Sequence, residues 1–346
     1  MSDIMKRVLL FLSSVFLLNS CALLSTKGMT HDLQIGAYYY DGWASDKSSA
    51  LTQKLLNQYA DRMPVWGWRD DSLEIMEQQI EIASKNGIDF FAFCWYWADD
   101  QGPFNEKVVK AEPAHTSLDL FLKARNKDKM KFCIMIANHD GARIEGEENW
   151  KRVIEYFADN YFSDSQYLTI NNNPVVIYYL PMEAQPHVAE MREVAVSKGY
   201  NGLYTMSCGY KLDGYDAQTW YNSFNGKKES EAQDYESLFS WIEGIRNKAS
   251  VNTVVAPLCS VGWDKRPWEN VEKSVYYVNK SPSAFRKHLY RAVDFLNSRN
   301  TPNPIIMIYA WNEYGEGGYL APTVGDKRGK FLKQIKNAKR YAKRKK

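Results

Sequence analysis

The sequence contains few of the residues that build metal centres and disulfide frameworks. It has five cysteines and five histidines among 346 residues, with no CxxC pair and no two histidines at ligand spacing. We therefore expect neither a metal nor another cofactor. The formal net charge is only +3, which gives no electrostatic argument for binding nucleic acid.

Long hydrophobic runs are also missing, with one exception near the N-terminus. A short basic stretch precedes the apolar run Val8 to Leu18, which is too short to span a bilayer comfortably as a mature helix. The run ends in Leu18-Asn19-Ser20-Cys21, which resembles a bacterial lipobox, where the chain is cut before a cysteine that is then lipidated. We interpret residues 1–20 as a lipoprotein signal peptide and 21–32 as a lipidated tether. The alternative is an ordinary secretory signal with an incidental cysteine.

The lipobox interpretation predicts where the protein is found. Lipidated Cys21 would hold the chain in the bacterial cell envelope, and Ala22 in place of Asp favours the outer membrane. Since no second apolar run is long enough to span a membrane, the lipid would be the only anchor. The basic stretch Lys339 to Lys346 is interpreted as a solvated helix end rather than a membrane patch, because cations are favourable there. We expect a monomer.

The four cysteines after Cys21 show no pattern of a metal site. Cys94 and Cys133 lie inside apolar runs, where a free thiol behaves as a small hydrophobe. Cys208 and Cys259 follow strand-like runs and would form a disulfide only if the fold made them adjacent.

Short apolar runs alternate with amphipathic segments over residues 33–346, without an internal repeat or a long linker. This pattern is typical of parallel strands joined by crossover helices. The predicted strands are Leu33 to Tyr40, Ile88 to Trp95, Lys131 to Ala137, Pro174 to Leu180, Gly202 to Met206, Ala217 to Tyr221, Thr253 to Leu258 and Pro304 to Ala310. The predicted helices are Asp71 to Asn86, Ser117 to Arg125, Glu147 to Phe162, Glu183 to Lys198, Tyr235 to Lys248, Ser283 to Ser298 and Gly329 to Lys345. Eight units predict one α/β catalytic domain, a single (β/α)₈ barrel with a long first βα loop, residues 41–70.

Aromatic and polar residues recur where the predicted strands end. In a (β/α)₈ barrel these ends build the functional face, and aromatic faces beside hydrogen-bonding groups suit a carbohydrate. Any one aromatic could equally belong to the core, and His139 could equally be a structural histidine. The predicted substrate-binding residues are Tyr39, Tyr40, Trp95, Trp97, Asn138, His139, Tyr179, Trp263, Asp264, Trp311 and Asn312.

Two carboxylates lie three residues apart just after the last predicted strand. Glu313 and Glu316 belong to the run Trp311-Asn312-Glu313-Tyr314-Gly315-Glu316-Gly317. Glycosidic cleavage needs a proton donor and a second group at the anomeric centre, and two nearby carboxylates push their pKa values apart. Glu313 and Glu316 are therefore the predicted catalytic pair. The alternative is that one of them caps the turn or pairs with a lysine.

These residues carry a resemblance to a known family. From about Leu33 to Tyr341 the chain resembles glycoside hydrolase family 99, more closely its family 99-like branch of WbsX-type domains. The matching segments are Ile35 to Tyr40, Gly87 to Trp97, Phe132 to Asn138 and, most specifically, Trp311 to Gly317. The resemblance implies a (β/α)₈ barrel that cleaves α-mannosides with retention and without a metal.

The resemblance also implies roles within the motif Asn-Glu-x-x-Glu-Gly. Glu313 would be the base that draws on the 2-hydroxyl of the sugar and gives an anhydro-sugar intermediate. Glu316 would be the acid/base that serves the leaving group and then water. Tyr314 and Gly315 stand where the mannan-active enzymes carry Trp-His, so the resemblance leaves the sugar open.

Two other functions remain open. WbsX-type domains were named as glycosyltransferases of polysaccharide assembly, but this chain has no Asp-x-Asp motif, and an exported lipoprotein meets no nucleotide-sugar pool. A glycan-binding lipoprotein without catalysis would explain the aromatics, but it would leave the two glutamates without a role. We therefore expect a glycoside hydrolase with a carbohydrate partner.

Overall fold

The structure is a computed structural model that describes residues 31–43, 48–97, 102–226, 231–269 and 274–345. The predicted signal peptide and Cys21 lie outside the described residues. Within the described part, no helix has the length and apolar character needed to cross a bilayer. The described cysteines, Cys94, Cys133, Cys208 and Cys259, are buried and free, so the last two do not form a disulfide.

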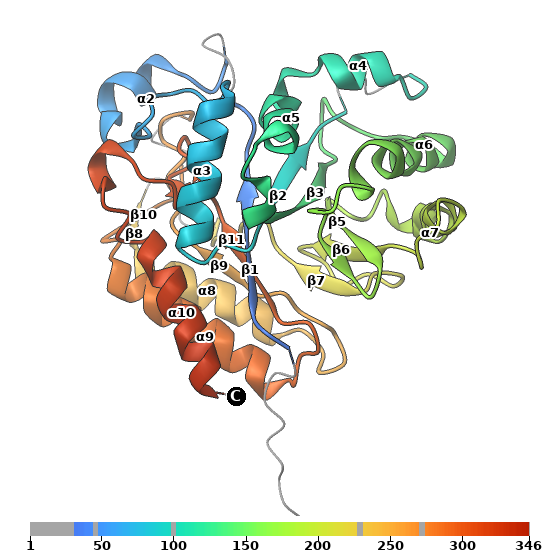
Figure 1. Ribbon diagram of the computed structural model, residues 1–346. Coiled ribbons are helices and arrows are strands. Elements are labelled where there is room, and N and C mark those ends of the chain that lie inside the picture. The colour runs from blue at the N-terminus through green and yellow to red at the C-terminus, as the bar shows by residue number, and fades with distance from the viewer. Residues whose placement is uncertain (1–30, 44–47, 98–101, 227–230, 270–273, 346) are drawn as a thin grey trace, which may run out of the picture.

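Eight parallel strands form the barrel, in the order β7-β6-β5-β3-β2-β1-β11-β9 (Figure 1). A bridge between Gln218 and Val255 joins the two ends of this sheet and nearly closes it. The strands are β1 (Gln34–Tyr39), β2 (Phe90–Trp95), β3 (Lys131–Ala137), β5 (Asn173–Tyr179), β6 (Tyr204–Cys208), β7 (Ala217–Thr219), β9 (Leu258–Ser260) and β11 (Ile305–Tyr309). The predicted (β/α)₈ barrel is confirmed.

Helices surround the barrel, and short strands decorate its loops (Figure 1). The described α-helices are α2 (Gln53–Gln58), α3 (Leu73–Lys85), α4 (Glu106–Ala111), α5 (Thr116–Lys123), α6 (Glu147–Phe157), α7 (Val188–Ser197), α8 (Tyr235–Asn247), α9 (Pro282–Ser298) and α10 (Leu332–Lys345). The short strands are β4 (Thr169–Ile170), which pairs with β5, β8 (Ala232–Asp234), which pairs with β10 (Tyr276–Val278), and β12 (Asn312–Glu313), which pairs with β13 (Gly318–Tyr319).

The two largest differences in where a predicted element begins both lie near a proline. The seventh strand was expected from Thr253, but β9 begins at Leu258, directly after Pro257, which has no N–H to donate to a ladder. The fourth crossover helix was expected from Glu183, but α7 begins at Val188, after a short 3₁₀ turn that contains Pro186. The helices α2 and α4 were not predicted, because each has only six residues.

Alternation along the strands decides which side chains face the interior of the barrel. Successive side chains of a strand point to opposite faces, so one set enters the barrel and the other packs on the helices. In β2, Phe93 packs against Phe121 of α5, with ring centroids 5.5 Å apart, whereas Cys94 lines the interior. This two-residue period determines which of the aromatics can reach a ligand.

Near the start of β1, a glycine makes room for an aromatic ring. Gly36 of β1 pairs with Phe90 of β2, and a Cβ atom on Gly36 would lie 2.1 Å from Phe90 Cζ. Phe90 is itself buried, so its ring has little freedom to move aside. Gly36 is therefore required by packing.

We expect Gly36→Ala to lower the free energy of unfolding by about 1–3 kcal/mol, because the added methyl overpacks the barrel. Urea denaturation measures the change. Gly244→Ala in α8 is the matched control: a Cβ there meets nothing within 4 Å, and alanine favours a helix over glycine by about 1 kcal/mol. Equal stability of Gly36→Ala and the parent chain would contradict this account of the packing.

Candidate active site

Both glutamates lie on one hairpin at the C-terminal end of the barrel. β11 ends at Tyr309, and the following hairpin pairs Glu313 of β12 with Gly318 of β13. The side chain of Asn312 fastens this hairpin to the end of β1: its Oδ1 accepts from Tyr40 N at 2.8 Å, and its Nδ2 donates to Tyr40 O at 2.7 Å. The hairpin is thus held over the open end of the barrel.

Two adjoining cavities meet at this hairpin. The smaller, of about 170 Å³, is lined by both glutamates together with Tyr40, Tyr96, His139 and Trp268, among others. The larger, of about 450 Å³, contains Trp263, Phe224, Lys265 and Glu269. Tyr179, Tyr221 and Glu316 line both. Glu316 therefore lies at the junction of the two cavities, whereas Glu313 belongs to the smaller one.

Glu313 is a buried carboxyl group with one strong partner. Only 3% of the surface of Glu313 is exposed to solvent. Tyr221 donates its hydroxyl proton to Glu313 Oε1, and Oε2 has no hydrogen-bond partner among the described residues. Burial, together with the negative charge of Glu316, raises the pKa of Glu313 well above its usual range. The unpartnered oxygen leaves room for a ligand hydroxyl.

Glu316 is held by a tyrosine and faces a lysine. Tyr309 donates its hydroxyl proton to Oε2, and Lys265 Nζ lies 3.7 Å from Oε1. Burial raises the pKa of Glu316, while the Tyr309 hydrogen bond and the Lys265 ammonium oppose the rise. Since the two carboxyl groups interact, one of them holds a proton more readily than an exposed glutamate does. Such a pair can both donate and accept a proton.

Four of the predicted substrate-binding residues line the two cavities. Tyr40, His139 and Tyr179 line the smaller cavity with the glutamates, and Trp263 lines the larger one with Tyr179. Trp263 stacks on Phe224, with ring centroids 4.4 Å apart. The structure therefore brings these four together around Glu313 and Glu316, and it offers a ligand both aromatic surface and polar groups.

Four other predicted substrate-binding aromatics pack on neighbouring side chains and do not line the two cavities. Tyr39 and Trp95 adjoin Tyr40 and Cys94, which line the smaller cavity, so the two-residue alternation points them away from it. Tyr39 packs on Phe91 and Phe93, Trp95 on His115 and Phe157, Trp97 on Phe104, and Trp311 on Phe91. All four are buried, and none lines either cavity.

Three polar side chains that were predicted to bind the substrate bind other groups of the protein instead. Asn138 accepts from Ile144 N at 2.7 Å and donates to Glu183 at 2.7 Å, which holds the loop after β3. Asp264 is buried in ion pairs with Arg62 and Arg266. Asn312 serves the hairpin as described above. These side chains position the loops around the site and do not line the cavities.

Several residues that surround the glutamates were not predicted from the sequence. Cys94 and Tyr96 share the inward face, which Trp95 and Trp97 do not, but the two-residue period alone does not say which of the two faces points inward. Trp268 comes from the loop after β9, and no periodicity predicts its position.

Trp268 also explains a feature of the motif. A Cβ atom on Gly315 would lie 2.1 Å from Trp268 Cε2, so the indole occupies the space of a side chain at position 315. Trp268 Nε1 donates to Ala50 O at 2.8 Å, which fixes the ring in place. Gly315 is thus required because the indole of Trp268, from a distant loop, leaves no room for a side chain there.

Over the residues that the structure describes, no three His, Cys, Asp or Glu side chains are grouped so that they could hold a metal ion.

Comparisons with known proteins place the chain in a family. Residues 67–335 match the family described as Glycosyltransferase WbsX. The chain belongs to this family. It is 23% identical over 282 residues to the protein WxcX, described as uncharacterized, of two strains of Xanthomonas campestris pv. campestris. The match covers 72% of this chain but only 39% of the length of these relatives.

Solved structures agree on the fold. A GH99 endo-alpha-mannosidase from Bacteroides thetaiotaomicron is similar with a TM-score of 0.60 and 16% identity, over 90% of this chain and 98% of that one. A glycoside hydrolase-like protein gives a TM-score of 0.62 at 15% identity, over 90% and 94% of the two chains. The family match and these structures confirm the resemblance to a family 99-like, WbsX-type domain.

The raised pKa values predict that the two glutamates destabilise the fold at neutral pH. Above the ordinary glutamate pKa of 4.5 the unfolded chain releases protons that the native site retains, so stability falls as pH rises through the native pKa values. We expect Glu313→Gln/Glu316→Gln to raise the free energy of unfolding by about 1–3 kcal/mol at pH 7, since each tenfold change in acidity corresponds to about 1.4 kcal/mol.

The gain should shrink towards zero near pH 4, where the parent carboxyl groups are protonated in both states. Urea denaturation at both pH values measures it. Exposed Glu145→Gln is the control and should leave stability unchanged at either pH. A double variant that is no more stable than the parent at pH 7 would contradict the burial cost.

Proposed function

We propose that this protein is a glycoside hydrolase that cleaves a glycan with Glu313 and Glu316 as its acid/base pair. The observation that carries the proposal is the pair of buried carboxyl groups with raised pKa values at the junction of two cavities. Glycosidic cleavage requires such a pair, and burial is the usual means of keeping one carboxyl protonated near neutral pH. The similarity to glycoside hydrolase structures supports the proposal through the fold alone.

The two cavities suggest how a glycan would lie. A sugar in the smaller cavity would place its hydroxyls against Glu313 and His139, and the leaving sugar would occupy the larger cavity beside Trp263. Glu316, which lines both, would then lie next to the bond between them. Trp263 and Phe224 would supply an apolar surface for the face of the leaving sugar.

The proposed chemistry follows the positions of the two carboxyl groups. The chemistry requires the form of the pair in which Glu313 is the carboxylate and Glu316 holds the proton. Glu313 would take the proton of the sugar's 2-hydroxyl through Oε2, the oxygen without a partner among the described residues, while Tyr221 holds Oε1. The 2-oxygen would bond to the anomeric carbon as the glycosidic bond breaks, and Glu316 would protonate the departing oxygen. Water would then attack the anomeric carbon and give a proton to Glu316, while Glu313 returns its proton to the 2-oxygen as the anhydro ring opens. The Lys265 ammonium would stabilise Glu316 once it has become a carboxylate.

α-Mannosides are the first substrates to test, because the solved neighbours include endo-α-mannosidases. The sugar ring would contact Trp268, which fills the place of a side chain at position 315. The mannan-active enzymes that this chain resembles carry a histidine in place of Gly315. An indole wall in place of that polar imidazole ring favours a sugar with a different pattern of substituents. A panel of glycans with varied sugars and linkages is therefore the matching assay.

The second candidate is a glycosyltransferase, which the description of the family favours. That function would require a sugar nucleotide as donor. Product formation from a glycan and water alone supports the hydrolase, whereas product formation only on adding a sugar nucleotide would support transfer. Glycan binding without turnover under either condition would support a binding protein.

The catalytic proposal predicts different losses on different substrates. Glu316→Gln should lose about 10²–10⁴-fold in kcat/KM on a natural glycan, because the leaving oxygen then lacks its proton donor. The loss should be much smaller on an activated aryl glycoside, whose leaving group departs unprotonated. Glu313→Gln should lose activity on both, since the anomeric centre needs help whatever leaves.

Steady-state rates on both substrate types measure this pattern, and Glu145→Gln, at an exposed residue that lines neither cavity, serves as a control. Both site variants should remain folded, because glutamine keeps the volume and accepts the tyrosine hydrogen bonds. Turnover near that of the parent by Glu313→Gln/Glu316→Gln would place the active site elsewhere in the barrel.

We also propose that the mature protein is held in the outer membrane by a lipid on Cys21. The support is the sequence Leu18-Asn19-Ser20-Cys21 at the end of the apolar run. Cys21→Ser should abolish acylation and shift the protein from the detergent phase to the aqueous phase in Triton X-114 partitioning. Ser20→Ala keeps the cysteine and should stay in the detergent phase. Unchanged partitioning of Cys21→Ser would disprove the anchor.

A further inference from the structure

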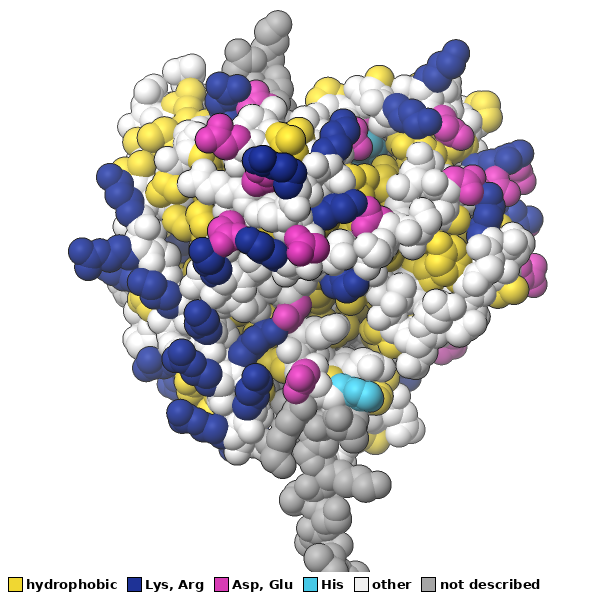
Figure 2. All heavy atoms as spheres, in the orientation of Figure 1, with side chains coloured by type: hydrophobic (Ala, Val, Ile, Leu, Met, Phe, Trp, Pro, Cys, Tyr) yellow, Lys and Arg dark blue, Asp and Glu magenta, His cyan; other side chains and the backbone are white. Residues whose placement is uncertain are grey.

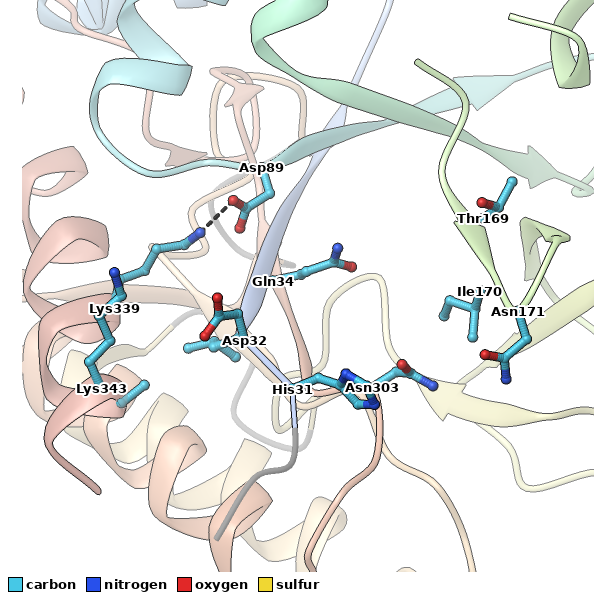
Figure 3. A pocket seen from close by; sticks show the side chains of 12 residues that line it. His31, Asp32, Gln34, Asp89, Thr169, Ile170, Asn171, Asn303, Lys339 and Lys343 are labelled. Atoms are coloured by element: carbon cyan, nitrogen blue, oxygen red, sulfur yellow. Dashed lines mark hydrogen bonds and ion pairs between the residues drawn. The ribbon is translucent and has the colours of Figure 1, made fainter. Parts of the chain in front are cut away.

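At the N-terminal end of the barrel, the described chain begins beside the last turns of α10. His31 and Asp32 line a hollow of about 480 Å³ together with Lys339 and Lys343 of α10 (Figure 3). Asp89, which precedes β2, lies in the same hollow and accepts a hydrogen bond from Lys339. The described chain therefore begins next to α10, at the end of the barrel opposite to the two glutamates.

The solvent face of α10 is strongly basic. Residues 332–345 contain seven Lys or Arg and no Asp or Glu. The apolar stripe Leu332, Ile335, Ala338 and Ala342 is buried against the barrel, so most of these cations point outwards. Figure 2 shows dark-blue side chains gathered over α9 and α10 on this side of the molecule.

Acidic neighbours neutralise only part of this charge. Lys339 pairs with Asp89, and Lys345 Nζ lies 3.3 Å from Asp294. Over the described residues, no ion pair within 4 Å involves Lys336, Arg340, Lys343 or Arg344, all of which are exposed, although Asp32 lies on the same face.

A solvated helix end accounts for only some of these cations. The helix dipole favours positive charge within the last turn, and its effect falls off beyond that turn. Lys333 and Lys336 lie more than two turns from the end of α10, so the dipole does not explain them. The basic face thus needs another explanation than the one expected from the sequence.

We propose that the exposed face of α10 and the adjoining N-terminal end of the barrel dock on an anionic lipid headgroup layer. The proposed anchor at Cys21, on which this inference rests only for its orientation, would hold this face close to a membrane. His31 lies ten positions after Cys21 (31 − 21 = 10), and a fully extended chain of that length spans at most about 35 Å. Electrostatic attraction acts within about 8 Å at physiological salt, so docking requires contact.

The test uses the chain from residue 21 with Cys21→Ser, which lacks both the lipid and the apolar run. Every strand and helix that the structure describes follows His31, so this chain retains all of them. Cosedimentation with vesicles of phosphatidylglycerol and phosphatidylethanolamine should show binding that phosphatidylcholine vesicles do not show. Sodium chloride at about 0.5 M should abolish it, because salt screens exposed charges.

Arg340→Gln/Lys343→Gln/Arg344→Gln should lower the vesicle partition coefficient at least about tenfold. The matched control removes three exposed cations near the opposite end of the barrel, Lys107→Gln/Lys110→Gln/Lys211→Gln, and should bind like the parent. Thermal unfolding checks that both variants are folded.

Equal binding to phosphatidylcholine vesicles, or equal losses in the two triple variants, would overturn the docking surface. Displacement by inorganic phosphate at an ionic strength at which sodium chloride leaves binding intact would also overturn it, in favour of a discrete anion site. Glycan turnover and Triton X-114 partitioning are separate measurements, so failure here leaves the hydrolase and the anchor to their own tests.

Discussion

The site depends on how firmly one hairpin is fixed across the open end of the barrel. Asn312 replaces a missing strand partner there: its amide bonds both backbone groups of Tyr40 and also donates to Asp70 Oδ2 at 3.1 Å. Because the amide is fully buried, losing these bonds would leave polar atoms unsatisfied. Asn312, which the sequence predicted as a substrate ligand, thus helps to set the position of both glutamates.

Positive charge fixes the same hairpin from behind. Arg62 donates to Tyr314 O at 3.0 Å and pairs with Asp264, and Lys280 Nζ donates to Gly317 O at 3.0 Å. Burial, helped by the nearby Arg62, lowers the pKa of Lys280 to about 8. Two carbonyl groups of the segment that carries the glutamates, Tyr314 O and Gly317 O, are therefore bound to cationic side chains. This arrangement keeps a glycine-rich turn in one conformation without a metal or a disulfide.

The sequence was sufficient to predict the barrel and the position of Glu313 and Glu316 after its last strand, but not the side chains that line the two cavities. Apolar runs and their spacing predict the strands, because burial on both faces leaves a clear pattern. Rows of adjacent aromatics such as Trp95-Tyr96-Trp97 leave the phase of a strand undetermined, since both faces are apolar in a barrel. Trp95 and Trp97 were chosen and Tyr96 was missed for that reason. Trp268 and Lys265 lie in a loop, where position depends on tertiary contacts that no local pattern encodes.

The opposite placement of the chain's entry and its two glutamates has a geometric consequence. The longer strands of the barrel, such as β5 and β11, have five to seven residues. Strands of this length separate the N-terminal end of the barrel from its C-terminal end by about 20 Å. If the N-terminal end rests on a membrane, the cavities face away from it, above the layer of headgroups. Sugars attached close to that surface would be out of reach, and the accessible substrate would be a chain that projects outwards or arrives from the surrounding medium. The length of the barrel strands would then set the minimum distance from the membrane at which a glycan can enter the cavities.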